Sequence, residues 1–241
     1  MDDTPATVQE AADGQDVIQL ERPESFDVMF VIDRSWSMGD DYEALAANIR
    51  SFVPALEGLL NEKQVDCRLG LLCYDVSMRW PWLDLTAGVS AFTEKLLAIK
   101  PGRRNECTPQ AMDFAVEHAS WRDGRRGYLA VMTDEAAENG GLPCTEAQFR
   151  MLLSKIGRRR LGLHFVTTPW ALGTGSQQRL YGLIPDYANT FVSGSLREDR
   201  GEKLVRWLAG SISTHKHTEP PLAAGLISHD IFGVFTLVTL L

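Results

Sequence analysis

Residues 26–32 (FDVMFVI) form an apolar run that leads directly into the polar stretch Asp33-Arg34-Ser35-Trp36-Ser37. A run of this length and composition predicts a β-strand buried on both faces. In open α/β sheets, binding sites form beyond the carboxyl ends of the strands. The polar stretch after this strand is therefore the first place to look for a functional site.

Strand-like and helix-like stretches alternate along the rest of the chain. Residues 65–74 and 76–83 predict two strands joined at Asp75, by a connection short enough to make them antiparallel neighbours. The alternation predicts an α/β fold, a Rossmann-like, doubly wound and mostly parallel six-stranded sheet with helices on both faces. The other predicted strands are residues 128–133, 161–167 and 187–192. The predicted helices are residues 40–60, 89–99, 146–156, 177–184 and 198–212. A further helix is predicted to have Thr108 as its N-cap and Pro109 at its first position.

Five oxygen-bearing side chains are expected at one edge of this sheet. Asp33, Ser35 and Ser37 alternate after the first strand, and alternate residues of an extended turn point to the same side. Thr108 begins a helix and Asp134 follows the strand at residues 128–133. Taken singly, these residues are also typical of turn caps and helix caps. Together, two carboxylates and three hydroxyls favour a hard cation, Mg²⁺, Mn²⁺ or Ca²⁺, over zinc.

This set of residues resembles the metal-ion-dependent adhesion site (MIDAS) of von Willebrand factor type A (vWA) domains. The resemblance rests on Asp33-x-Ser35-x-Ser37, then Thr108, then Asp134, and it extends over about residues 24–213 through the order and spacing of the strands. It implies a sheet with one antiparallel edge strand. It also implies that the two serines and Thr108 contact the metal directly, and that the two aspartates hold its waters or ligate it in a closed state.

The function implied by the resemblance is divalent-cation-dependent binding of a protein partner, with an Asp or Glu of the partner completing the coordination of the metal. Stand-alone cytoplasmic domains of this kind resemble adaptor or regulatory subunits of bacterial multiprotein systems that contain an AAA+ ATPase, a protease or a conflict-response component. The chain departs from the family pattern at Trp36 and Glu135, where glycine is common. We expect these two residues, together with Glu106, to contact the partner. We expect Asp40, Asp41, Asp75 and Glu138 to be surface charges.

Two other functions compete with this reading. The first is a metal-dependent hydrolase that uses the same cation, which needs a positioned general base. No histidine falls within the five ligand segments, and Glu135 is the one obvious base there. The second is a metal-independent scaffold that acts through its termini.

Composition limits the class of partner. The 241 residues carry a net charge of -8, and 44% of them are hydrophobic. That hydrophobic content is enough for a sizeable core. An acidic chain with no basic stripe is a poor candidate for a nucleic-acid-binding protein.

Three regions are predicted: an acidic leader at residues 1–22, a vWA domain at residues 23–213, and a linker with an apolar segment at residues 214–241. Residues 1–21 include six acidic and no basic residues, and they lack the apolar core of a secretory signal. The apolar stretch at residues 231–241 is too short to span a bilayer. We expect it to dock on the domain or, within residues 226–241, to pair two copies. The four cysteines form no zinc-binding pattern, which together with the leader predicts a reduced, cytoplasmic protein.

Overall fold

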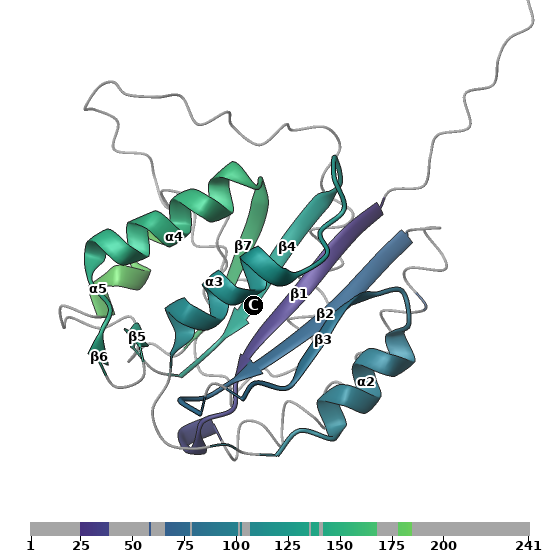
Figure 1. Ribbon diagram of the computed structural model, residues 1–241, viewed down its shortest axis with the longest axis horizontal. Coiled ribbons are helices and arrows are strands. Elements are labelled where there is room, and N and C mark those ends of the chain that lie inside the picture. Colours follow the sequence, from purple (N-terminus) through teal and green to yellow (C-terminus); the bar gives the residue numbers. More distant parts are fainter. Residues whose placement is uncertain are drawn as a thin grey trace, which may run out of the picture.

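The computed structural model describes residues 25–38, 58, 66–77, 79–100, 102, 107–134, 136–139, 142–167 and 178–184. Within these residues, five strands form one mixed sheet in the order β3-β2-β1-β4-β7 (Figure 1). The strands of this sheet are β1 (Ser25–Asp33), β2 (Asp66–Tyr74), β3 (Trp82–Thr86), β4 (Arg126–Met132) and β7 (Leu161–Val166). The helices are the short 3-10 helix η1 (Trp36–Met38), α2 (Val89–Leu97), α3 (Thr108–His118), α4 (Glu146–Arg158) and α5 (Gln178–Tyr181), and a separate ribbon pairs β5 (Glu138–Asn139) with β6 (Leu142–Pro143).

The predicted fold class is confirmed. Strand β1 pairs in parallel with β2 and β4, β4 pairs in parallel with β7, and β3 runs antiparallel to β2 at the edge of the described sheet. The sixth predicted strand, at residues 187–192, lies outside the described residues and stays a prediction. The predicted helices at residues 40–60 and 198–212, the acidic leader and the apolar C-terminal segment also lie outside them, apart from Gly58, which is helical.

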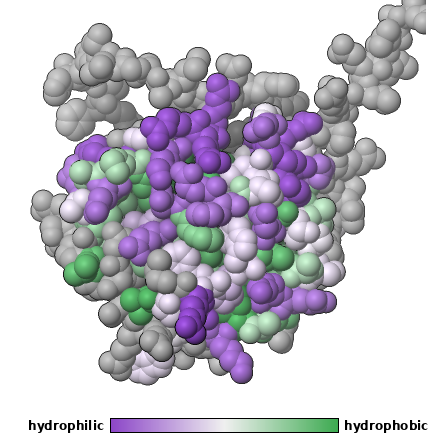
Figure 2. Space-filling view, viewed as in Figure 1, coloured by the Kyte–Doolittle hydropathy of each residue, from purple (hydrophilic) through white to green (hydrophobic). Residues whose placement is uncertain are grey.

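Both faces of the sheet are buried, which explains why the strands are apolar runs. Successive side chains of a strand point to opposite faces. In β1, Met29 and Val31 belong to the core under α3 and α4, whereas Phe30 and Ile32 belong to the core under α2. Figure 1 shows α3 and α4 over one face of the sheet. Much of the described surface visible over these helices is hydrophilic (Figure 2), consistent with a layer that faces solvent.

Among the predicted boundaries that change, three lie at the candidate site or next to it. Strand β1 continues through Asp33 instead of ending at residue 32, so the aspartate is part of the sheet. The stretch after β2 is a turn rather than a strand, because the Asp75 carboxylate accepts hydrogen bonds from the backbone N–H and the hydroxyl of Ser77. Strand β3 therefore starts only at Trp82. The N-cap of α3 is Cys107, and Thr108 is the first residue of the helix instead of its cap.

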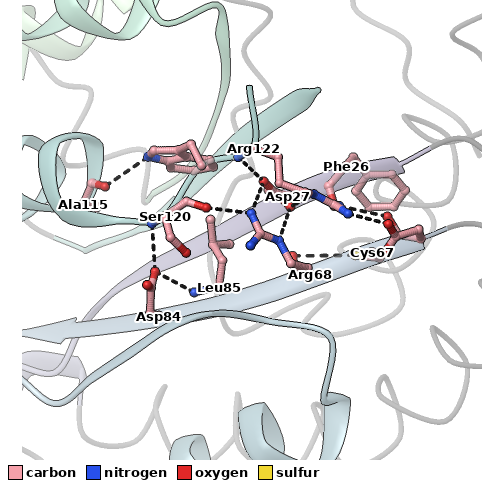
Figure 3. Close-up of polar contacts among 11 residues, drawn as sticks. Phe26, Asp27, Cys67, Arg68, Asp84, Leu85, Ala115, Ser120 and Arg122 are labelled. Atoms are coloured by element: carbon pink, nitrogen blue, oxygen red, sulfur yellow. Dashed lines mark hydrogen bonds and ion pairs between the residues drawn. The ribbon is translucent and has the colours of Figure 1, made fainter. Parts of the chain in front are cut away.

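Near the amino ends of the parallel strands, the buried carboxylate of Asp27 in β1 bonds to Arg68 of β2 and to Arg122, which precedes β4 (Figure 3). Asp27 is 1% exposed and accepts two hydrogen bonds from the Arg68 guanidinium, at 2.9 and 2.8 Å. It also accepts hydrogen bonds from the Nε and the backbone N–H of Arg122, each at 2.9 Å. Burial raises the pKa of Asp27, but the hydrogen bonds and positive charges of the two arginines outweigh burial, so that the net shift is downward.

We expect Asp27→Asn to lower the free energy of unfolding by about 2–3 kcal/mol. Loss of one partner of a fully buried ion pair costs roughly 3–5 kcal/mol, and the two arginines are partly exposed. Urea unfolding followed by circular dichroism measures the change. Arg150→Ala is the control, because it breaks an exposed pair with Glu146 and should change stability by less than about 1 kcal/mol. Equal effects of the two substitutions would contradict the role assigned to Asp27.

Candidate metal centre

The centre of the candidate site is the buried carboxylate at the end of β1. Asp33 is 0% exposed. Its Oδ1 accepts a hydrogen bond from the backbone N–H of Ser35 at 2.7 Å, and its Oδ2 accepts one from the Thr133 hydroxyl at 3.0 Å. Since Thr133 follows β4, the carboxylate is held from its own loop and from the neighbouring strand. The orientation of Asp33 is thus fixed by the pairing of β1 with β4.

The two serines and the second aspartate form a chain of side-chain contacts next to it. Ser35 Oγ and Ser37 Oγ lie 2.9 Å apart, and Ser37 Oγ donates to Asp134 Oδ1 at 3.2 Å. The serines are brought together by the turn into η1, where Met38 N–H bonds to the carbonyl of Ser35, rather than by the extended turn that we expected. Ser35 is buried and Ser37 is exposed, so the chain runs from the interior to the surface.

Thr108 reaches this edge of the sheet through a different partner. Its hydroxyl is buried and lies 2.7 Å from the phenol oxygen of Tyr74, the last residue of β2. Tyr74 pairs with Asp33 in the sheet register. Burial and the charge of Asp33 raise the pKa of Tyr74 well above its ordinary value, so the phenol stays neutral. Thr108 is therefore connected to Asp33 through β2.

The charges of two carboxylates, Asp33 and Asp134, interact at this edge. Burial, with a further contribution from the charge of Asp134, raises the pKa of Asp33 to about 7, although hydrogen bonds from Ser35 and Thr133 act in the opposite direction. A cation bound near the two carboxylates would stabilise their charged forms and so offset both causes of the shift. The donors in the set are oxygens only, and that chemistry fits a hard divalent cation.

The described residues contain no group of three or more His, Cys, Asp or Glu side chains arranged to hold a metal. The candidate set differs from such groups because three of its five members carry hydroxyls. The four cysteines, all of which are described, are buried and form no disulfide.

Some residues expected near the site are placed differently, and others were missed. Trp36 is 64% exposed beside the serines, while Glu106 and Glu135 lie outside the described residues, as do Asp40 and Asp41. Asp75 is only 1% exposed, so the expectation of a surface charge is wrong for this residue. It is buried because it pairs with Arg34 at 2.9 Å.

The sequence reading also missed Thr133 and Tyr74 as contacts of the site. The alternation along β4 contains a signal for Thr133, because Leu129 and Val131 point to the α3 face and the threonine is next in that series.

The sequence around this site matches a known protein family. The sequence model described as the von Willebrand factor type A domain matches residues 27–162, which is more than half of the chain. The chain belongs to the vWA domain family. The matched region contains all five candidate ligands.

Solved structures similar to this vWA domain share its fold at low sequence identity. Proximal thread matrix protein 1 (PTMP1) from the mussel byssus, in a structure with a zinc-occupied MIDAS motif, is 14% identical with a TM-score of 0.54, and the match covers 79% of this chain and 46% of PTMP1. BatB from Bacteroides thetaiotaomicron is 14% identical with a TM-score of 0.54, over 78% of this chain and 98% of BatB. The pilus adhesin SpaC from Lactobacillus rhamnosus GG is 14% identical with a TM-score of 0.57, over 80% of this chain and 30% of SpaC.

This chain thus spans less than half the length of PTMP1. A search of the curated proteins gave no match. None of the helices described in this vWA domain has the length and apolar composition needed to span a bilayer.

The raised pKa of Asp33 predicts a pH dependence of the metal-free domain. The unfolded chain loses this proton near pH 3.8, whereas the folded protein keeps it until about pH 7. The stabilisation that protonated Asp33 contributes to the folded protein is therefore complete below about pH 3.8 and is lost as the pH rises to 7. In EDTA, wild type should lose up to about 4 kcal/mol relative to Asp33→Asn over this range.

Urea unfolding at several pH values measures this difference. The matched comparison is wild type against Asp27→Asn. Because folding lowers the pKa of Asp27, wild type should lose stability relative to this variant as the pH falls below about 3.8, the opposite direction to Asp33. Parallel pH profiles for wild type and Asp33→Asn would contradict the shift at Asp33.

Proposed function

We propose that Asp33, Ser35, Ser37, Thr108 and Asp134 form a MIDAS that holds one divalent cation, preferably Mg²⁺, with Mn²⁺ or Ca²⁺ as alternatives. The observation that carries the proposal is the chain from Ser35 through Ser37 to Asp134, which lies beside the buried carboxylate of Asp33. Hydroxyl ligands together with two carboxylates suit a hard cation. The zinc in the PTMP1 structure makes Zn²⁺ the competitor to test.

The proposed roles follow the placement of each side chain. Ser35, Ser37 and Thr108 would contact the cation directly through their hydroxyls. Asp33 and Asp134 would hold its waters or ligate it directly. Asp33 already orients the loop through the N–H of Ser35, and Asp134 lies at the more open side of the site. Bound there, the cation would supply an electrophilic position for a carboxylate from outside.

The function that fits this site best is cation-dependent binding of a protein partner. An Asp or Glu of the partner would complete the coordination, and Trp36, Glu106 and Glu135 would contact the surrounding partner surface. We infer an adaptor or regulatory subunit, in the cytoplasm, within a bacterial multiprotein system that contains an AAA+ ATPase, a protease or a conflict-response component. Membership of the vWA family supports the binding role.

A binding role accounts for the described residues better than hydrolysis does. Hydrolysis needs a general base within hydrogen-bond reach of a held water. Of the histidines that the structure describes, His118 ends α3 at the opposite end from Thr108, and His164 lies within β7 against the ring of Tyr128. Glu135, the other candidate base, lies outside the described residues. We propose that the protein is not an enzyme. Phosphate release from a panel of esters, with Mg²⁺ and with EDTA, tests this.

Calorimetric titration should show one site for Mg²⁺ and for Mn²⁺ in wild type and none in Asp33→Ala or Asp134→Ala. Each substitution removes one of the two carboxylates that attract the cation. Asp113→Ala is the matched control, since this aspartate pairs with Lys155 on the outer side of α3 and its loss should leave binding unchanged. Unchanged binding in both site variants would rule out this set of ligands.

Trp36→Ala should weaken partner binding at least tenfold and leave the Mg²⁺ affinity within about twofold. An exposed tryptophan at the centre of an interface typically contributes 2 kcal/mol or more, whereas its side chain supplies no ligand oxygen. The partner is captured on the immobilised domain in Mg²⁺, and proteins that also bind in EDTA or to Asp33→Ala are discarded. Met151→Ala on α4, where the methionine is also 64% exposed, is the control. Equal partner affinities for the two variants would show that Trp36 lies outside the interface.

A further inference from the structure

The carboxyl end of β2 supplies no proposed ligand, yet it contacts two of the three segments that do, the loop after β1 and the start of α3. We propose that Tyr74 and Asp75 are positioning residues of the cation site. Tyr74 orients the hydroxyl of Thr108, and Asp75 holds the loop after β1 and the residue that precedes Thr108 in place. This inference rests on the proposed function, because it assigns residues to the same site. It concerns two side chains that do not contact the cation themselves.

Tyr74 is placed to fix the rotamer of Thr108. Its ring is fully buried in the core under α3, and the phenol oxygen lies 2.7 Å from Thr108 Oγ1. A threonine hydroxyl can rotate among staggered positions, and the bond to Tyr74 selects one of them. Either oxygen can be the donor of this bond. The threonine oxygen keeps both lone pairs for a cation if it donates to the phenol, and one lone pair if it accepts from the phenol.

Asp75 fastens the loop that contains Asp33, Ser35 and Ser37. Its Oδ2 pairs with the Arg34 guanidinium at 2.9 Å. The backbone of Arg34 is held on both sides, because its N–H donates to the Tyr74 carbonyl at 3.0 Å and its carbonyl accepts from Gly102 N–H at 2.6 Å. A Cβ at Gly102 would overlap Asp75 Oδ2, so any larger residue there would have to displace this carboxylate.

The backbone carbonyl of Asp75 fastens the loop that leads to Thr108. It accepts a hydrogen bond from Cys107 Sγ at 3.2 Å and another from Trp80 Nε1 at 2.8 Å. Cys107 is the N-cap of α3 and directly precedes Thr108. A single buried residue therefore contacts both the β1 loop and the start of α3.

A merely structural role is the alternative, and the chain offers matched controls for it. Asp27 is as buried as Asp75 and also pairs with arginine, but it lies at the start of β1, at the other end of the sheet. Tyr128 lies near the start of β4 and packs against Phe26 and His164. Asp27→Asn and Tyr128→Phe thus repeat the chemical changes of Asp75→Asn and Tyr74→Phe far from the site.

The test measures Mg²⁺ affinity by calorimetry in the full chain, on variants that circular dichroism shows to be folded, and measures urea unfolding in EDTA separately. We expect Tyr74→Phe and Asp75→Asn to weaken Mg²⁺ binding by roughly tenfold, the low end of the loss typical for an outer-shell partner. Asp27→Asn and Tyr128→Phe should stay within twofold of wild type even where they lower stability. In a Thr108→Ala background, Tyr74→Phe should have no further effect, because it acts through that hydroxyl.

The outcomes separate this inference from the proposed function. Wild-type affinity in Tyr74→Phe and Asp75→Asn, with binding lost in Asp33→Ala, would overturn the positioning role and leave the site intact. Equal losses in Asp75→Asn and Asp27→Asn would show that affinity follows global stability, which also overturns the role of Asp75. If Asp75→Asn does not fold, the inference is tested by the Mg²⁺ affinity of Tyr74→Phe, alone and combined with Thr108→Ala. No Mg²⁺ binding by wild type would overturn both the inference and the proposed function.

Discussion

The burial of the Asp33 carboxylate is the constraint on which the rest of the site depends. A buried charge is costly unless hydrogen bonds or an opposite charge compensate it. Hydrogen bonds reach this carboxylate from Ser35 and from the Thr133 hydroxyl, while Asp134 adds negative charge nearby. Burial and the charge of Asp134 outweigh these hydrogen bonds, so that the net shift of the pKa of Asp33 is upward. A carboxylate held in this state attracts a cation more strongly than one that is already paired with an arginine.

Comparison with Asp27 makes the contrast clear, because the same strand carries a buried aspartate at each end. Asp27 is surrounded by the guanidinium groups of Arg68 and Arg122, and the net effect lowers its pKa. Asp33 has hydroxyl and N–H donors instead, and its pKa is raised. One end of β1 is a closed ion-pair network that holds strands together. At the other end, burial and the charge of Asp134 favour the protonated form of Asp33, whereas a cation bound there would favour its charged form.

The sequence was sufficient to predict the layers, the mostly parallel sheet and the antiparallel pairing of β2 with the strand after it, because these depend on local patterns. Apolar runs such as β1 and β4 indicated strands buried on two faces, and the structure confirms a mostly parallel sheet with one antiparallel edge. The prediction for the stretch after β2 was wrong, because the turn there depends on the Asp75 carboxylate bonding to Ser77. An aspartate in a connection usually indicates an exposed turn. Its burial here depends on Arg34 and Gly102, which approach from other parts of the chain.

The five candidate ligands could be named from spacing, yet spacing could not reveal what orients them. Two of the five are carboxylates and three are neutral hydroxyls, so charge alone supplies little of the selectivity of such a site. A neutral oxygen is a useful ligand only where its lone pair points at the ion, and its contribution is therefore sensitive to small displacements. Orientation must come from neighbouring contacts such as those of Thr108 with Tyr74 and of Asp33 with Thr133. These contacts join β1, β2, β4 and α3, so the geometry of the site is a property of the whole sheet edge.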